Sequence, residues 1–508
     1  AIQHDPGHAL AWQKLGALLA LLKRGHEALH CYREALRLDP SDLKTLGDAL
    51  FLRRHLADWD PGQGPQPAQL LSGFATATRS DFPPMLLLAM AEADAPAQLR
   101  AAAKFARSQW APALARPPLA TRPQDPAGRR LRVGYLSSDF RDHAVSYLTV
   151  ETIAAHDRAT VEVFLYAHGP PRNDAWRRSA VEAADHFVEL GALDDHAAAR
   201  RIFDDGIDVL VDLNGYTQEG RPGILALRPA AVIATWLGYV GTLGEPRLAD
   251  FVISDAVATP PELEACFSES LALMPHCFQA NSRLSAAAPP PSRASQGLPD
   301  QGVVFCSFNQ TFKLHPALWD DWCEILRGVP GGVLWLAPPR DPAAIDNLRT
   351  EAQRRGVAPE RLVFADQQPR EQHLARLALA DIALDTWPYN SGTTASDALR
   401  MGVPLLAFPG DTFVGRMAAS LLGAAGMPEC IGRDRSQCVA HAIALGNQPA
   451  SREQLRRQLH ERLPASPLFR PDLFARDLER LLAAMHARKR SGGPGTVQVA
   501  ADGRSTPP

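Results

Sequence analysis

The sequence predicts an α/β protein with an all-α region at its N-terminus and two doubly wound parallel-sheet domains after it. Two observations support this prediction. An early segment repeats with a period typical of paired helices, and the later chain alternates short apolar runs with helical stretches. Alternating strands and helices favour parallel sheets covered by helices on both faces. We therefore expect three parts in chain order: helices, a first sheet and a second sheet.

The N-terminal part, 1–115, carries an internal repeat. Asp5-Pro6 recurs as Asp39-Pro40 after 34 residues, and the positions between them include Trp12, Leu15, Gly16, Gly25, Ala28, Tyr32 and Ala35. This order matches the tetratricopeptide pattern, in which small residues let two helices pack closely. An ordinary amphipathic helix pair is the simpler alternative. Because such units need neighbours, we expect 41–115 to form further helices that cap the stack. The chain opens inside the repeat, which leaves room for natural residues before Ala1.

A Pro-rich linker, 116–128, precedes the first α/β domain, 129–285. Its expected strands are 131–137, 161–166, 209–213, 231–237 and 251–253. A Pro-, Ser- and Ala-rich stretch, 286–301, separates it from the second domain, 302–487, whose expected strands are 303–308, 332–336, 362–364, 382–387 and 404–408. The tail 488–508 is polar with Gly and Pro, and we expect it to be disordered. Ligands of such sheets bind outside the carboxyl ends of the strands, so the cleft between the domains is the predicted substrate site.

Composition excludes several classes of protein. The chain has 508 residues, 46% of them hydrophobic, and a net charge of −3 without a long basic run, which argues against nucleic acid as the main partner. Seven scattered cysteines without a CxxC pair favour reduced thiols in a cytoplasmic protein. The longest early apolar run, 17–22, is too short to span a membrane, so no membrane partner is expected.

The segment 390–397, Asn-Ser-Gly-Thr-Thr-Ala-Ser-Asp, is the strongest indication of a binding site. It follows an apolar run and precedes a short helix. Free N–H groups and the positive end of the helix dipole favour phosphate at such a loop. Two threonine hydroxyls add donors, and Asp397, one turn into the helix, suits a ribose diol.

Four further groups follow expected strands or a helix start. His143 could serve as a base or bind a sugar, although a surface histidine is the ordinary alternative. Asn214, Tyr216, Leu237 and Gly238 lie in loops where glycine allows close approach, although Asn-Gly is also a common turn. Lys313 could neutralise a leaving diphosphate with help from Gln310, although a lysine at a helix start is usually a solvated charge. His373 and Arg376 could contact a base, or could simply form the exposed face of a helix.

Motifs that are missing from the sequence narrow the chemistry. It contains no GxGxxG, GxxxxGK[ST], HExxH or GxSxG, which weakens dehydrogenase, P-loop, zincin and hydrolase interpretations. Asp58-Trp59-Asp60 has the Asp-x-Asp form of metal-dependent sugar transferases, but it lies in the helical region and away from either sheet. We interpret it as structural and expect no metal and no cofactor.

Several of these residues carry a family resemblance. They are 132–140 with His143, 214–217, 236–239, 274–276, 308–310, Lys313, Thr393-Thr394 and Asp397. Together with the helical repeats, they resemble the O-linked N-acetylglucosamine transferase family over nearly the whole chain, from Ala1 to about Met485. The resemblance implies a GT-B fold of two Rossmann-like domains. It also implies inverting, metal-independent transfer of GlcNAc from UDP-GlcNAc to Ser or Thr hydroxyls of proteins, guided by the repeats.

The resemblance also implies roles for individual residues. Lys313 and Gln310 hold the diphosphate with the amides of Thr393 and Thr394, and Asp397 takes the ribose hydroxyls. The residues implied around uracil and the ribose are His373, Arg376, the backbone near Gln368, and Arg370. The residues implied for the sugar and acceptor cleft are His143, Asn214, Tyr216, Leu237, Gly238 and His276. Whether His143 is the general base or only positions the substrates stays open, because a donor phosphate oxygen or a relayed water could accept the proton.

The sequence also departs from the animal members of the family. The repeat array is shorter, the long insert between the catalytic halves is missing, and Gly392 stands where the animal pattern has His. These differences suggest a bacterial-type homologue and leave the acceptor less certain than the donor. Two alternatives remain: a protein O-fucosyltransferase of similar architecture that uses GDP-fucose, and a repeat scaffold with a decayed transferase domain.

Overall fold

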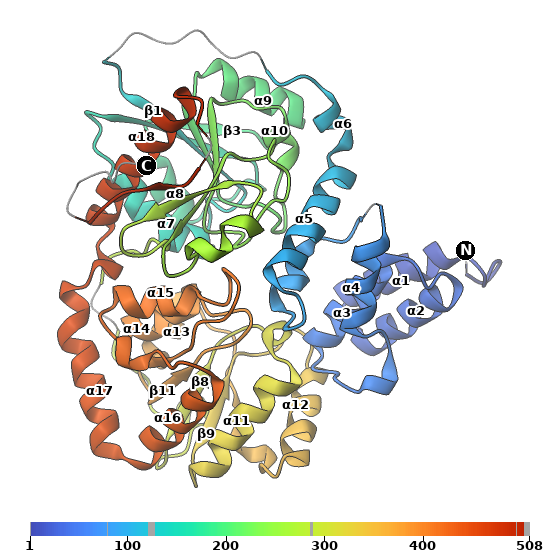
Figure 1. The fold of residues 1–508 in the computed structure, drawn as a ribbon. Helices are drawn as coiled ribbons and strands as arrows, with labels where there is room; N and C mark the ends of the chain where they lie inside the picture. The colour runs from blue at the N-terminus through green and yellow to red at the C-terminus, as the bar shows by residue number, and fades with distance from the viewer. Residues whose placement is uncertain (1, 79, 120–127, 285–287, 494, 502–508) are drawn as a thin grey trace.

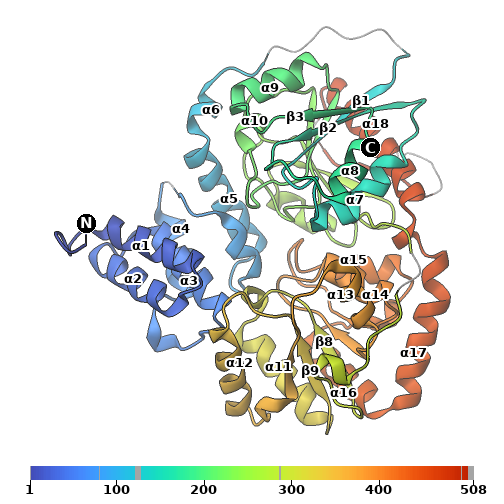
Figure 2. The same ribbon diagram turned by 180° about the vertical axis from the view of Figure 1, so that it is seen from behind.

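The computed structural model describes residues 2–78, 80–119, 128–284, 288–493 and 495–501. Two α/β domains lie one above the other, and the N-terminal helices project from the side of the second domain (Figure 1). The view from behind shows that α5 and α6 run along the first domain, on the side opposite α17 and α18 (Figure 2). The helical region therefore contacts both α/β domains.

The helical region begins with two antiparallel helices. Its helices are α1 (Ala9–Leu21), α2 (Gly25–Leu38), α3 (Leu43–His55), α4 (Pro67–Thr76), α5 (Ala95–Gln109) and α6 (Ala111–Ala115), with 3-10 turns η1 (Pro61–Gln63) and η2 (Pro84–Ala89). A Cβ at Gly16 would lie 2.8 Å from the Tyr32 ring, so the repeat needs glycine there for α1 and α2 to approach. This close packing confirms the predicted helix pair, and α3 to α6 confirm further helices in 41–115.

The first domain is built on a sheet in which every pairing is parallel. Its strands are β1 (Leu131–Ser137), β2 (Val161–Ala167), β3 (His186–Glu189), β4 (Val209–Asp212), β5 (Val232–Thr235), β6 (Phe251–Asp255), β7 (Ser270–Met274) and β13 (Val497–Gln498). Their order is β13-β7-β6-β5-β4-β1-β2-β3. The order reverses between β1 and β4, so the loops after these strands open a crevice. The helices are α7 (Ala144–Ala154), α8 (Ala175–Glu182), α9 (Asp195–Asp204) and α10 (Pro222–Ala226), with η3 (Pro261–Cys266).

The second domain repeats this design on a smaller sheet. Its strands are β8 (Val304–Ser307), β9 (Val333–Leu336), β10 (Leu362–Phe364), β11 (Ile382–Leu384) and β12 (Leu405–Leu406), in the order β10-β9-β8-β11-β12. The order reverses between β8 and β11, which places the loops carrying Lys313 and Thr393 at the switch point. The helices are α11 (Pro316–Gly328), α12 (Ala343–Arg354), α13 (Arg370–Leu377), α14 (Thr393–Arg400), α15 (Met417–Ala424), α16 (Arg435–Asn447) and α17 (Pro449–Arg462), and the 3-10 turns are η4 (Ala294–Gln296), η5 (Thr311–Lys313), η6 (Pro359–Arg361), η7 (Pro428–Cys430), η8 (Leu463–Ala465) and η9 (Pro467–Phe469).

All ten strands expected from the sequence are present, and β3, β7 and β13 were missed. β3 is an edge strand whose His186 and Glu189 are exposed, so it lacks a continuous apolar run. β13 is only two residues long and lies in a segment rich in Gly. These strands form through their neighbours in the sheet, which a single sequence does not show.

The chain returns to the first domain at its C-terminal end. Helix α18 (Pro471–Arg490) buries Leu478, Leu481, Leu482 and Met485 in the core of the first sheet. Val497 and Gln498 then pair with β7. The prediction of a disordered tail from 488 is therefore wrong for the described residues up to 501, because α18 brings this segment to the open edge of β7. Residues 494 and 502–508 lie outside the described residues.

Within the described residues, no helix has the length and apolar character needed to cross a membrane.

Candidate functional site

A cavity of about 1130 Å³ lies where the helical region and both sheets meet. Its lining includes Asp48 and Phe51 of the helical region, residues after β1 and β5, and the loops after β8 and β11. Among the predicted site residues, those that line it are His143, Tyr216, Leu237, Gly238, Gln310, Lys313, Thr393 and Thr394. The structure therefore brings together predicted residues from both domains in one space at the sheet edges.

Lys313 ends η5 and points back toward the loop after β11. Its Nζ donates to the carbonyl oxygen of Asn390 at 2.9 Å and to Oδ1 of Asn309 at 3.1 Å. The ammonium also lies 4.1 Å from the centre of the Tyr389 ring. These contacts fix a cation at the wall of the cavity, which is where a leaving diphosphate needs one. Gln310, one turn before Lys313, is exposed to the same cavity.

Burial shifts the pKa values of Lys313 and of the nearby Asp385. It lowers the pKa of the Lys313 ammonium to about 8, while the charge of Asp385 acts in the opposite direction. Burial likewise raises the pKa of the Asp385 carboxyl above its ordinary value, and Lys313 opposes this shift. Each of the two groups, when charged, therefore limits the shift that burial causes in the pKa of the other.

The helix α14 begins at the predicted phosphate loop. Thr393 and Thr394 are its first two residues, and their amides have no partner within the helix because they belong to its first turn. Gly392 precedes them, and a Cβ there would lie 3.0 Å from Oε1 of Gln279, a residue of the first domain. The N-terminus of α14 is thus an anion-binding end placed directly on the cavity.

Asp397 lies one turn further along α14 and is paired with Arg370. The guanidinium of Arg370 binds both carboxylate oxygens, at 2.7 and 3.0 Å, and lies 4.1 Å from the centre of the Tyr147 ring of α7. The sequence predicted both residues near a ribose, and the structure places them beside each other. A diol bound by Asp397 would meet a carboxylate already held in position by Arg370.

His373 lies in the middle of α13 and Arg376 lies in its last turn. Arg376 is buried and donates to the carbonyl oxygen of Asp366 at 2.7 Å and to Nδ1 of His373 at 3.1 Å. Contact of its guanidinium with a base stays a prediction, because these hydrogen bonds use only part of its five N–H donors. His373 packs edge-on against Phe308 at 4.9 Å between ring centres, and burial lowers its pKa to about 4. Gln368 is half-buried in the loop between β10 and α13.

His143 is the N-terminal cap of α7 and lines the cavity. Its Nδ1 accepts from the amide of Val145 at 3.3 Å and lies 3.7 Å from Oδ2 of Asp139. Burial lowers the pKa of the imidazole, and the nearby Asp139 carboxylate opposes that shift. His143 is therefore mainly neutral at neutral pH, as a proton acceptor must be.

The remaining first-domain residues shape the wall of the cleft. Asn214 is fully buried and ties together the loops after β1 and β4: its Oδ1 accepts from the amide of Ser138 at 2.8 Å, and its Nδ2 donates to Oδ2 of Asp139 at 2.9 Å. The Tyr216 hydroxyl donates to the carbonyl of Leu243, and its ring stacks on Trp110 at 5.4 Å. Asn214 thus acts through the loop that holds His143, whereas Tyr216 presents part of its ring.

Leu237 and Gly238 form a strained turn after β5. Leu237 adopts φ +73°, which is unusual for a residue with a Cβ, and a Cβ on Gly238 would overlap the carbonyl oxygen of Leu213.

We expect Gly238→Ala to lower the free energy of unfolding by about 3 kcal/mol, measured by urea denaturation. Gly423→Ala is the matched control, since nothing lies within 4 Å of its added Cβ in α15, and it should be neutral or slightly stabilising. Equal effects from both substitutions would contradict the steric argument.

His276 is half-buried and follows β7. It does not line the cavity, and its charge acts on Asp477 of α18. Its placement in the sugar and acceptor cleft stays a prediction.

Several further residues of the site were not predicted from the sequence. They are Tyr389 beneath Lys313, Tyr147 over Arg370, Gln279, and Asp385. Gln279 lines the cavity and donates through Nε2 to Oγ of Ser396 at 2.7 Å, so it joins the first domain to α14. Asp385 had a detectable signal, a carboxylate directly after a buried strand. The other contacts depend on how the domains meet.

Within the part of the chain that the structure describes, no group of three or more His, Cys, Asp and Glu side chains is arranged to hold a metal ion.

Comparison with known proteins gives a consistent result. The sequence pattern of Glycosyl transferase family 41 matches residues 111–285 and 284–478. A probable UDP-N-acetylglucosamine–peptide N-acetylglucosaminyltransferase of Arabidopsis thaliana is 34% identical, over 69% of this chain and 36% of that protein. The UDP-N-acetylglucosamine–peptide N-acetylglucosaminyltransferase of Caenorhabditis elegans is 30% identical, over 72% of this chain and 42% of that protein. The chain thus spans less than half the length of these curated relatives.

One solved structure is similar over almost the whole chain. It is a mutant O-GlcNAc transferase of Thermobaculum terrenum, with 29% sequence identity and a TM-score of 0.80. The match covers 97% of this chain and 93% of that one. It confirms the predicted architecture of N-terminal helices followed by two parallel-sheet domains of the GT-B type.

Proposed function

Since this chain belongs to glycosyl transferase family 41, we propose that it transfers N-acetylglucosamine from UDP-N-acetylglucosamine to Ser or Thr hydroxyls of proteins, with inversion at the sugar carbon. The observation that carries the proposal is the placement of Lys313 and the N-terminus of α14 on one cavity shared by both domains, with Asp397 one turn further along the same helix. The names of the Arabidopsis, Caenorhabditis and Thermobaculum proteins support the same donor and reaction.

The second domain is proposed to hold the donor. Lys313, Gln310 and the amides of Thr393 and Thr394 bind the diphosphate, and Asp397, held by Arg370, binds the ribose hydroxyls. His373 contacts the base together with the backbone near Gln368. Arg376 donates hydrogen bonds to His373 and to the carbonyl oxygen of Asp366, and so holds both in position. Lys313 and Asp397 are already held in place by hydrogen bonds, so binding through them carries little ordering cost.

The chemical step is proposed to need no metal. As the bond between the sugar and the diphosphate breaks, negative charge builds on the departing phosphate oxygen. The Lys313 ammonium and the α14 amides stabilise that charge because they are fixed beforehand and partly shielded from water. The acceptor oxygen forms the new bond from the opposite face of the sugar, and its proton leaves to a base. His143 is placed to accept that proton or to orient the hydroxyl.

The acceptor is proposed to enter from the helical side of the cavity. Lys44, Asp48 and Phe51 of α3 line this side, together with Asp81. Helix α3 also packs on the loop that carries Lys313, since Phe51 and Phe312 lie 5.4 Å apart between ring centres. A polypeptide guided by the repeats would therefore reach the donor site without leaving the protein surface.

Titration calorimetry with UDP and GDP tests the donor. We expect UDP to bind about tenfold more tightly or better, because fixed backbone groups near Gln368 pair with one base edge and leave a wrong base unpaired. Tighter binding of GDP would favour the fucosyltransferase alternative, and no binding of either would favour a decayed scaffold. Mass spectrometry of lysate proteins after incubation with UDP-N-acetylglucosamine then tests transfer itself.

A further inference from the structure

Lys313 and Asp385 bind opposite ends of a single peptide group. The Lys313 ammonium donates to the carbonyl oxygen of Asn390 at 2.9 Å, and the amide of Ser391 donates to Oδ1 of Asp385 at 2.7 Å. That carbonyl and that amide belong to the same planar unit, which joins Asn390 to Ser391. In a trans unit they point in opposite directions, so the positive N–H end of the peptide dipole faces the Asp385 carboxylate and its negative carbonyl end faces the Lys313 ammonium.

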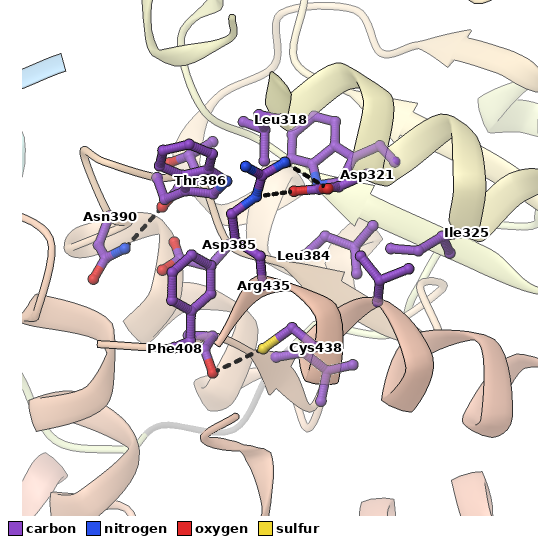
Figure 3. A pocket seen from close by; sticks show the side chains of 15 residues that line it. Leu318, Asp321, Ile325, Leu384, Asp385, Thr386, Asn390, Phe408, Arg435 and Cys438 are labelled. Carbon is purple, nitrogen blue, oxygen red and sulfur yellow. Dashed lines mark hydrogen bonds and ion pairs between the residues drawn. The ribbon is translucent and has the colours of Figure 1, made fainter. Parts of the chain in front are cut away.

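Neighbouring side chains fix this peptide group on both sides. Asn309 donates through Nδ2 to Oγ of Ser391 at 2.7 Å, and its Oδ1 accepts from Lys313. The Asn390 side chain donates through Nδ2 to the carbonyl of Thr386 at 2.8 Å (Figure 3). The loop therefore has little freedom to rotate this unit, and the two charges stay aligned through it.

Asp385 is buried on the side of the loop away from the donor cavity. Its second oxygen, Oδ2, has no hydrogen-bond partner among the described residues, and the residue lines an internal cavity of about 40 Å³ (Figure 3). Arg435 lines the same cavity, but Arg435 is paired with Asp321 of α11 at 2.8 Å. A buried carboxylate with one free oxygen needs a nearby cation.

The remaining groups that face the pair carry no competing charge. The Cys438 thiol of α16 donates to the carbonyl of Ala407 at 3.2 Å, and burial raises its pKa to about 11. Burial also raises the pKa of the Tyr389 phenol, which lies under Lys313, to about 12. Both groups are neutral near pH 7, so within the described structure Lys313 is the cation that balances Asp385.

We propose that Asp385 is a positioning residue for Lys313, acting through the peptide group between Asn390 and Ser391 to fix the ammonium in place and to keep it charged. Its carboxylate orients the peptide unit, whose carbonyl then holds Nζ at the wall of the donor cavity. Asp385 also offsets the effect of burial, which by itself would favour the neutral amine. The importance of this arrangement for catalysis rests on the proposed function. The hydrogen bonds that link Asp385 to Lys313 do not depend on that proposal.

The test is a titration of Lys313 in protein labelled with ¹³C at the lysine ε-carbon, followed by NMR without any donor. The other lysines are Lys14, Lys23, Lys44, Lys104 and Lys489, and loss of one resonance in Lys313→Arg identifies Lys313. We expect Asp385→Asn, which keeps an oxygen for the Ser391 amide but removes the charge, to move the Lys313 midpoint down by about one pH unit or more. In the variant, the alkaline limb of the transferase pH profile should shift in the same direction.

Asp321→Asn is the matched control, because it removes a carboxylate from the same internal cavity without touching the loop. It should leave the Lys313 midpoint unchanged. An unchanged midpoint in Asp385→Asn, or an equal shift in Asp321→Asn, would overturn the proposal. Should Asp385→Asn not fold, the native protein still decides: a Lys313 midpoint near or above 8 supports the proposal, and one below 7 overturns it. The titration of Lys313 does not require enzymatic turnover. If the proposed function is wrong, the Lys313 midpoint will still shift as expected in Asp385→Asn, but the protein will transfer no sugar.

Discussion

Lys313→Ala is expected to lower the rate of sugar transfer at least about 100-fold. Removal of one preorganised group that stabilises developing charge costs about 3 kcal/mol of barrier, and each 1.4 kcal/mol is about tenfold in rate. Lys313 is the cation held at the cavity wall by Asn309 and Asn390, so its loss leaves the departing diphosphate without that charge. The measurement is kcat for transfer from UDP-N-acetylglucosamine, with KM determined separately.

Two variants control this experiment. Lys489→Ala removes a lysine that pairs with Asp250 far from the cavity, and it should leave kcat unchanged. Lys313→Arg restores a cation but not the compact geometry of an ammonium, so partial recovery of kcat is expected. A Lys313→Ala protein that folds and turns over the donor at the native rate would refute the proposed role of Lys313.

Asp397→Ala is expected to weaken UDP binding about 30-fold or more and to destabilise the protein. The substitution removes the proposed partner of the ribose hydroxyls, and hydrogen bonds to charged groups contribute roughly 1.5–3 kcal/mol. It also leaves the Arg370 guanidinium, now bound at 2.7 and 3.0 Å, without its carboxylate. We expect a loss of roughly 2–3 kcal/mol in the free energy of unfolding, at the low end for buried pairs because Arg370 is partly exposed. Calorimetry with UDP and urea denaturation measure the two effects.

The double variant Arg370→Ala/Asp397→Ala separates these effects. It leaves no unpaired charge, so its stability should lie closer to the native value than that of Asp397→Ala alone. UDP binding should stay weak, because the ribose partner is still missing. Recovery of UDP binding in the double variant would show that Asp397 acts only by neutralising Arg370, and would contradict the assigned contact.

Some features of the site were predictable because they depend only on neighbouring residues in the sequence. The segment 390–397 shows a strand end, small residues and a helix start in consecutive positions, and the structure places Thr393 and Thr394 at the beginning of α14. Lys313 likewise follows a short apolar strand by a few residues. Because both strands flank the point where the sheet order reverses, their loops must converge. Topology alone therefore brings Lys313 to Asn390.

Features that depend on distant parts of the chain were not predictable in this way. The direction of the Arg376 side chain is decided by the carbonyl of Asp366 and by His373, which use its donors internally. The order of the C-terminal segment depends on α18, and the sequence of α18 does not indicate which sheet its apolar face covers. Asp385 falls inside the apolar run 382–387 that was expected to form a strand, whereas β11 ends at Leu384 and the carboxylate begins the loop.

The return of α18 to the first sheet has a mechanical consequence. The chain passes from the first domain to the second between β7 and β8, and passes back between α17 and α18. Two covalent connections join the same two bodies, so the domains cannot separate or twist freely as they would on a single tether. Relative displacement of the two domains is therefore more restricted than it would be if a single crossing joined them, and any change in the width of the donor cavity has to be accommodated at both crossings.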